Sequence, residues 1–146
     1  IGKRGSQNAA DGIFSKYIRL KHSFESSDTR YCVCYTCGTP HKITEIQNGH
    51  WQRRGFITTR YNEDNCRPQC VKCNYHRSGE PEKFELHLIH DLGQQRVNEL
   101  KALSQQLGED NPQYYAQINA TYRSKFNELL KQLGIKNPWK KKISDL

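Results

Sequence analysis

The sequence predicts an α+β fold in which short strands around a cysteine cluster are flanked by helices at both ends. Three observations carry this prediction: helical periodicity near both termini, a β-rich segment over residues 31–61, and two C-x-x-C pairs in and just after that segment. A chain of 146 residues fits one domain, and only 34% of its residues are hydrophobic, so we expect no large apolar core.

The first half of the chain is predicted to hold one helix and several strands. Residues 1–10 are Gly-rich and basic, which indicates a flexible lead-in. Asp11 can serve as an N-cap, and the apolar residues after it recur near the helical period, which predicts a helix over about residues 12–25. From Tyr31 to Tyr61, β-formers alternate with turn residues. We assign residues 11–93 to one core that includes this helix.

The second half of the chain is predicted to be helical. Gly and Pro residues bound its periodic segments. The last two segments are amphipathic and joined by "GEDNPQ", which predicts a helical hairpin extension over residues 94–134. The apolar stripes of this hairpin are expected to form either core or a dimer surface. Residues 135–146 form a basic tail. The four helices are expected over residues 70–79, 81–93, 97–107 and 114–133.

The charge of the chain predicts a polyanionic partner. The net charge is +8 and the pI is about 9.2, and the basic excess lies at both ends of the chain. Nucleic acid is the commonest such partner, and a solvated basic surface is the alternative. No run of 18 apolar residues occurs, which excludes a membrane-spanning helix, and we find no secretory leader. Because the chain begins at Ile1 and contains no Met, we expect its natural start to be missing.

Four of the six cysteines have the spacing of a structural metal site: Cys34 with Cys37, and Cys70 with Cys73. Two residues between cysteines let both sulfurs reach one tetrahedral ion, so four thiolates can hold a structural Zn²⁺ that supplies folding free energy. Disulfides are the alternative, which an intracellular environment disfavours. Cys32 and Cys66 are treated as spare thiols.

A histidine and an asparagine near these cysteines suit hydrolysis of phosphodiesters. A hairpin carrying His50 and a helix carrying Asn74, pinned together by zinc, would place both side chains in one cleft. A neutral imidazole can deprotonate water, and an amide oxygen is a hard ligand for Mg²⁺ or Mn²⁺. Asn65 can brace the loop that carries His50. The alternative for His50 is a structural or solvated histidine.

Several motifs agree in their order along the chain: C-x-x-C-G at 34–38, G-H at 49–50, R-[FY]-N-E-x-N at 60–65, Q-C-x-x-C-N at 69–74 and S-G at 78–79. With them, the segment from Phe14 to Leu100 resembles the NinG (Rap) family of lambdoid-phage recombination endonucleases, within the HNH or ββα-metal nuclease group. The resemblance implies a treble-clef zinc fold and cleavage of branched DNA such as Holliday junctions and D-loops. It also implies a phage-encoded protein in the bacterial cytoplasm, with a phage recombination protein as a partner.

The same resemblance assigns roles to residues. By motif position, His50 is the general base, Asn65 takes the middle HNH position, and Asn74 is a ligand of the catalytic metal. The NinG family often has a histidine where this chain has Arg67. Many HNH nucleases carry an acidic metal ligand just before the base histidine, and this chain has Gly49 at that position. The second protein ligand therefore stays open among four candidates: Gln47, Asn48, His76 and Glu63.

Basic side chains near these residues are candidates for phosphate binding. They are Arg53, Arg54 and Arg60 near His50, Lys72 and Arg77 near Asn74, Lys3 and Arg4 at the start, and Lys140, Lys141 and Lys142 beside Trp139 at the end. Some of them are expected to be plain surface charges. Trp51 is either a packing residue or a platform for base stacking.

Two functions follow as hypotheses. The first is a Mg²⁺-dependent endonuclease that acts on branched DNA as a two-fold homodimer. The second is a non-catalytic zinc-knuckle module that binds DNA. This alternative stays open because the chain has Gly49, not an acidic metal ligand, just before His50.

Overall fold

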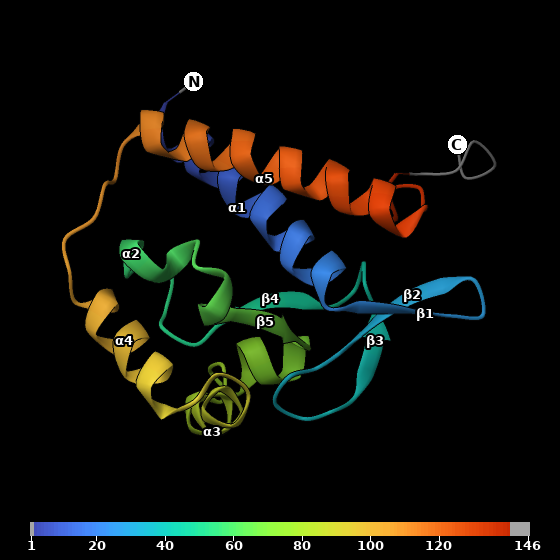
Figure 1. Ribbon diagram of the computed structural model, residues 1–146, viewed down its shortest axis with the longest axis horizontal. Coiled ribbons are helices and arrows are strands. Elements are labelled where there is room, and N and C mark those ends of the chain that lie inside the picture. The colour runs from blue at the N-terminus through green and yellow to red at the C-terminus, as the bar shows by residue number, and fades with distance from the viewer. Residues whose placement is uncertain (1, 141–146) are drawn as a thin grey trace.

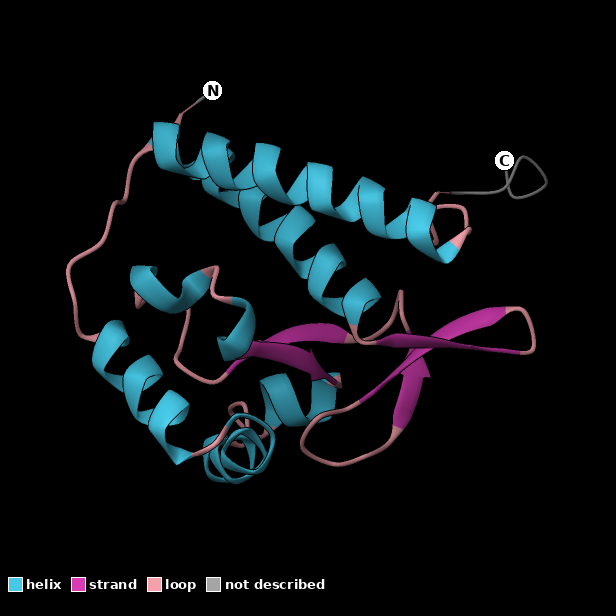
Figure 2. Cartoon of the chain, in the orientation of Figure 1, coloured by secondary structure: helices cyan, strands magenta, loops and turns pink. Residues whose placement is uncertain are grey.

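The computed structural model describes residues 2–140 and has an α+β architecture with two small sheets (Figures 1 and 2). Two short helical turns, η1 and η2, precede and follow strand β5, and η2 is π-helical. The elements in chain order are α1 Lys3–Lys21, β1 Ser23–Ser26, β2 Thr29–Val33, β3 Pro40–Lys42, β4 Gln47–His50, α2 Ile57–Arg60, η1 Glu63–Asn65, β5 Cys66–Gln69, η2 Lys72–His76, α3 Pro81–Leu92, α4 Gln94–Ser104 and α5 Pro112–Leu133.

Both sheets are antiparallel. The first has the strand order β1-β2-β3, and the second consists of β4 and β5. In the second sheet, Gln47 pairs with Gln69 and His50 pairs with Cys66. This register carries the chain from the end of β5 directly to Cys70, next to the start of β4.

The first helix differs from the sequence prediction at both ends. It begins at Lys3, so the expected flexible lead-in is wrong for residues 3–10, and Asp11 lies mid-helix rather than at an N-cap. The helix ends at Lys21, and residues 23–26 form β1 instead of helix. Tertiary packing explains the early start: Ser6 and Ala10 are buried, and such small side chains let α5 pack closely along α1 (Figure 1).

The predicted helical hairpin is also wrong. Helix α4 packs against α3 and α2, whereas α5 packs against α1, and the connection between α4 and α5 runs along one side of the molecule (Figure 1). Each apolar stripe has its own partner: Val97 and Leu100 lie in a cluster with Trp51, and Tyr115 and Tyr122 lie in a cluster with α1. The inner residues of these stripes are therefore core, whereas Leu107 and Leu133 at their ends are exposed. A dimer surface stays a prediction.

Trp51 and Trp139 both pack against the protein. Trp51 is 9% exposed and contacts the α3–α4 cluster, which confirms packing rather than base stacking. Trp139 lies 5.9 Å from Phe126, centroid to centroid, and its ring is covered by the Arg19 guanidinium at 4.8 Å. The start of the basic tail thus contacts the core, whereas Lys141 and Lys142 lie outside the described residues.

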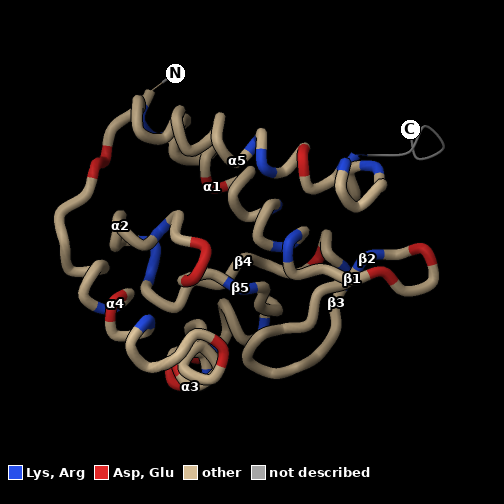
Figure 3. The backbone as a smooth tube through the Cα atoms, in the orientation of Figure 1, with Lys and Arg blue, Asp and Glu red and all other residues tan. Residues whose placement is uncertain are grey.

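Charged side chains are distributed unevenly over the fold. Figure 3 shows basic residues near the C-terminal end of α5 and acidic residues on α3 and at the turn between β1 and β2. Within residues 2–140, no helix combines the length and the hydropathy needed to span a membrane.

Candidate active site

The four cysteines of the two C-x-x-C pairs form one cluster. The Sγ atoms of Cys34, Cys37, Cys70 and Cys73 all lie within 4.8 Å of one another, and those of Cys37 and Cys70 are 3.8 Å apart. Tetrahedral Zn²⁺ with bonds of about 2.3 Å requires sulfur separations of about 3.8 Å. Gly38, at a φ of 78°, makes the knuckle turn that such a site needs. The cluster therefore fits a structural zinc.

The two other cysteines lie outside this cluster. Cys32 is buried, and its thiol donates to the backbone oxygen of Arg19 at 3.1 Å. Cys66 is buried in β5, where it pairs with His50. Burial raises the pKa of the Cys32 thiol to about 12, so this group is protonated and unreactive. The prediction that both are spare thiols agrees with these positions.

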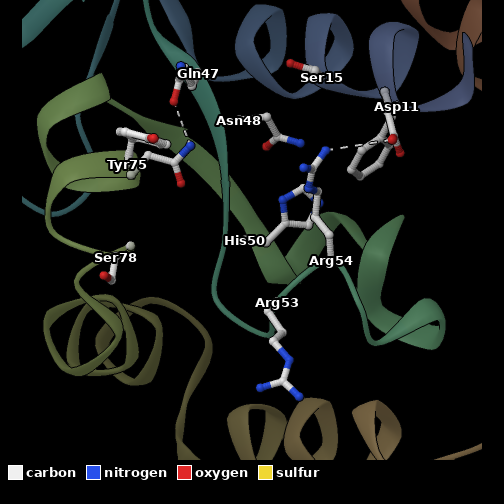
Figure 4. A pocket seen from close by; sticks show the side chains of 12 residues that line it. Asp11, Ser15, Gln47, Asn48, His50, Arg53, Arg54, Tyr75 and Ser78 are labelled. Carbon is white, nitrogen blue, oxygen red and sulfur yellow. Dashed lines mark hydrogen bonds and ion pairs between the residues drawn. The ribbon is translucent and has the colours of Figure 1, made fainter. Parts of the chain in front are cut away.

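A pocket of about 510 Å³ lies where α1, β4 and η2 meet (Figure 4). It brings together side chains that are far apart in the sequence. Its lining comprises Asp11, Phe14, Ser15, Gln47, Asn48, His50, Arg53, Arg54, Asn74, Tyr75, Ser78 and Gly79. The two residues predicted to carry the chemistry, His50 and Asn74, are both in this set.

His50 is held as a neutral imidazole. Its Nε2 lies 2.9 Å from the backbone oxygen of Arg60, and because a carbonyl can only accept, Nε2 carries the proton. The lone pair of the neutral ring is therefore on Nδ1. Burial lowers the pKa of His50 to about 4, and the positive charges of Arg54 and Arg60 act in the same direction. The imidazole is thus uncharged at neutral pH, with one proton on Nε2 and none on Nδ1.

Asn74 lines the same pocket as His50. Its Nδ2 donates to Gln47 Oε1 at 2.8 Å, which is the dashed line that starts at Gln47 in Figure 4, so Gln47 orients the Asn74 amide. Asn74 Oδ1 receives no hydrogen bond from residues 2–140. Asn48 Oδ1, in the same pocket, is buried and also without a partner. Two amide oxygens are therefore available for a hard cation.

Asn65 lies beneath the pocket rather than in it. It is fully buried, its Nδ2 donates to the backbone oxygens of Gln52 and Thr59 at 3.0 Å, and its Oδ1 accepts from Gln52 N at 2.7 Å. These bonds fix both ends of the loop that follows His50. This is the bracing geometry expected from the sequence.

Two of the four candidates for a second metal ligand lie away from the pocket. His76 is exposed at the end of η2, where its ring contacts Tyr75. The Glu63 carboxylate accepts hydrogen bonds from Lys21, Tyr122 and Lys125, so it ties η1 to α1 and α5. Asn48 and Gln47 line the pocket, and Gln47 is already engaged by Asn74.

The arginines near His50 divide into two kinds. Arg53 and Arg54 are exposed at the pocket and can reach a bound phosphate. The side chain of Arg60 is only 12% exposed and is bonded to Asp11, so it is not free to bind DNA. Arg67 is likewise buried, and it donates to three backbone oxygens.

The remaining basic candidates lie elsewhere on the described surface. Lys72 and Arg77 are exposed near Asn74, and Arg77 pairs with Glu80 at 3.6 Å. Lys3 pairs with Asp110 at 3.4 Å. Lys140 lines a different cavity, which it shares with Arg30, Lys42 and Lys136.

Asp11 is a residue of the pocket that sequence reasoning missed. Its carboxylate accepts from Arg60 Nε at 2.9 Å and Arg60 Nη2 at 2.6 Å, and from Tyr61 Oη at 2.7 Å. Arg54 Nη1 lies 3.8 Å from the same group. The spacing of Ser6, Ala10 and Phe14 by four residues could have extended the helix backwards and placed Asp11 on an inner face.

Gly49 stands where many HNH nucleases have an acidic ligand, and packing explains the glycine. A Cβ at this position would lie 2.0 Å from Oε1 of Gln69, a fully buried side chain that donates to Thr36 and to the Gly79 backbone oxygen. No side chain fits at Gly49 unless Gln69 moves. An acidic residue is therefore excluded by the neighbouring strand.

The substitution Gly49→Ala tests this crowding. We expect it to lower the free energy of unfolding by about 1–3 kcal/mol, because Gln69 must leave its buried bonds. Gly12→Ala is the matched control: it lies in α1, a Cβ there meets nothing within 4 Å, and Ala favours helix by about 0.5–1 kcal/mol. Urea denaturation of both variants measures the difference. Equal stability of Gly49→Ala and wild type would contradict the packing argument.

Comparison with known proteins identifies the family of this chain. The family described as Bacteriophage Lambda NinG protein matches residues 3–132, which is most of the chain. The chain belongs to the NinG family. Among curated NinG proteins, it is 33% identical to Protein ninG of Escherichia phage lambda and 29% identical to Protein ninG of Salmonella phage P22, each over 87 residues.

The NinG alignments are partial. They cover 56% of this chain and 40% of each of these two relatives. The matched family confirms the resemblance found in the sequence motifs. No solved structure matches the chain.

Proposed function

We propose that this NinG chain is a divalent-metal-dependent endonuclease that hydrolyses phosphodiesters in branched DNA. The observation that carries the proposal is the meeting of His50, from β4, and Asn74, from η2, in one pocket directly beside the cysteine cluster. The arrangement of β4, β5 and η2 around that cluster supports assignment to the treble-clef, ββα-metal class.

The side chains of the pocket have the properties that such a reaction needs. Nδ1 of neutral His50 can take a proton from an attacking water. The free oxygens of Asn74 and Asn48 can hold Mg²⁺ or Mn²⁺, and a bound cation of this kind stabilises charge on the phosphate and the leaving oxygen. Arg53 and Arg54 can bind flanking phosphates.

The preference for branched DNA rests on family membership and on the distribution of charge. Arg53 and Arg54 lie at the pocket, whereas Lys136 and Lys140 lie at a separate cavity, so phosphates can be bound in more than one place. A four-way junction offers several duplex arms to such a surface. The homodimer and a phage recombination partner remain predictions.

Cleavage of a synthetic four-way junction tests the proposal. We expect the zinc-loaded wild type to nick the junction in Mg²⁺ or Mn²⁺ and to cut a linear duplex of the same sequence more slowly. Asn74→Ala should require more metal and cut about 100-fold more slowly, because a metal ligand is lost. Asn127→Ala, an exposed position on α5, is the control and should cut as wild type does.

The second candidate function is a non-catalytic zinc module that binds DNA. One observation favours it: among residues 2–140, the carboxylate that lines the pocket is that of Asp11, and Arg60 and Tyr61 already engage it. Tight junction binding by the wild type, with no cleavage in Mg²⁺, Mn²⁺ or Co²⁺, would establish this module and refute the nuclease.

A further inference from the structure

Asp11 occupies a place in the pocket that the proposed chemistry does not use. It lies in the middle of α1, and its side chain faces the pocket beside His50 and Arg54 (Figure 4). Both carboxylate oxygens accept hydrogen bonds: Oδ1 from Arg60 Nε and Tyr61 Oη, and Oδ2 from Arg60 Nη2. A carboxylate held by so many donors is fixed in position.

Arg60 connects Asp11 with His50. Its guanidinium is gripped by both oxygens of Asp11, at 2.9 and 2.6 Å, and its Nη1 donates to the backbone oxygen of Arg54 at 3.0 Å. Its own backbone oxygen accepts the Nε2 proton of His50 at 2.9 Å. The guanidinium and the backbone carbonyl both belong to Arg60, at the end of α2. When Asp11 holds the guanidinium, it therefore also restricts the position of the carbonyl.

We propose that Asp11 is a positioning residue for the base: through Arg60 it holds a carbonyl on Nε2 of His50, and so keeps the lone pair on Nδ1. This inference rests on the proposed function, in which Nδ1 takes the proton. It makes α1 part of the nuclease site. Without Asp11, the Arg60 side chain loses its partner, the carbonyl can shift, and His50 can exchange between its two neutral tautomers.

The charges around His50 support the same role. Arg54 and Arg60 both lie beside the imidazole, and Asp11 compensates the buried charge of Arg60. Arg54 Nη1 stays 3.8 Å from Asp11 with 62% of its side chain exposed, so Arg54 can turn to a phosphate without loss of a short bond. Asp11 thus holds Arg60 firmly and leaves Arg54 free to bind a phosphate.

Direct metal binding is the rival role for Asp11. Carboxylates are preferred ligands of Mg²⁺, and this one lines the pocket. However, Arg60 and Tyr61 occupy both oxygens with bonds of 2.9 Å or less, and a cation there would face the Arg60 guanidinium. Loss of a metal ligand would raise the Mg²⁺ concentration that cleavage requires, whereas loss of a positioning residue would not. This difference separates the two roles.

The test uses Asp11→Asn in the full, zinc-loaded chain, with Glu128→Gln as the matched control. Glu128 is an exposed carboxylate on α5, and its change removes the same charge from a helix far from His50 in sequence and outside the pocket lining. For each protein we would measure junction cleavage, the Mg²⁺ concentration for half-maximal rate, and the ¹⁵N shifts of the His50 ring without Mg²⁺. His50→Ala identifies the His50 signals.

For Asp11→Asn we expect kcat to fall about 10- to 100-fold, with KM for the junction and the Mg²⁺ requirement within about twofold of wild type. The ring ¹⁵N shifts should move from those of a fixed Nε2–H tautomer toward averaged values. Glu128→Gln should match wild type throughout. A raised Mg²⁺ requirement with an unchanged tautomer would overturn the proposal in favour of a metal ligand.

Two further outcomes are decisive. If Asp11→Asn loses zinc or its fold, Asp11→Glu, which keeps the charge, takes its place: reduced kcat with a partly averaged tautomer supports positioning, and wild-type values for both overturn it. If the wild type binds the junction but does not cut it, the proposed function fails, while the ¹⁵N shifts of Asp11→Asn still decide whether Asp11 fixes the His50 tautomer.

Discussion

Replacing His50 with alanine is expected to abolish cleavage of a four-way junction while leaving its binding intact. A positioned general base contributes about 100- to 10,000-fold to a rate, and His50 is the histidine among the residues that line the pocket. The His50 side chain is uncharged at neutral pH and bonds to the backbone oxygen of Arg60, so its loss removes no phosphate-binding charge and affinity should be unchanged. Single-turnover cleavage and filter binding without Mg²⁺ measure the two effects.

The pH dependence of cleavage gives this prediction a second readout. Burial lowers the pKa of His50 to about 4, whereas an ordinary histidine titrates near 6.5. A base must be unprotonated, so activity is lost as the pH falls through the pKa of the base. We therefore expect His50 to remain an active base at pH 5.5. A His50→Ala protein that cuts as well as wild type would show that His50 is not the base.

Replacing Cys70 with serine is expected to unfold the protein rather than to inactivate a folded one. The cysteine cluster joins the turn after β2 to η2, and the apolar groups around it, such as Leu20, Ile43 and Phe126, are few. A structural zinc contributes about 10–16 kcal/mol in small zinc domains, which is comparable with the whole stability of an ordinary domain, about 5–15 kcal/mol. Losing one thiolate therefore removes most of the stability.

Zinc content and circular dichroism measure this effect. Wild type should bind one zinc per chain and melt cooperatively, whereas Cys70→Ser should lack both zinc and a transition. Cys32→Ser is the matched control, because Cys32 lies outside the cluster and a hydroxyl can keep its bond to Arg19. A folded, zinc-free Cys70→Ser protein would contradict a structural zinc.

Local signals in the sequence were sufficient to predict the four-cysteine cluster and several helices. The C-x-x-C spacing fixes which sulfurs can share an ion, and Pro81 and Gly134 mark where α3 begins and α5 ends. His50 and Asn74 were chosen from the motifs that contain them, and both line the same pocket, while their chemical roles stay predictions.

Long-range packing accounts for what the sequence did not reveal. The start of α1 has a Gly-rich and basic composition, and only the partner helix α5 explains why it is helical. The pairing of α4 with α3 rather than α5 depends on Trp51, which is distant in sequence. Asp11 was missed for the same reason, since its partners Arg60 and Tyr61 lie 49 and 50 residues later in the chain, between β4 and β5.

The central claim is that His50 and Asn74 form one metal-dependent nuclease site, and a double-mutant cycle tests it most directly. Single-turnover junction cleavage would be compared for wild type, His50→Ala, Asn74→Ala and the double variant, all with one zinc per chain. Residues that act together on one step give non-additive losses. We expect the double variant to be no slower than the slower single variant. Losses that multiply, or a wild-type rate in either single variant, would contradict a shared site.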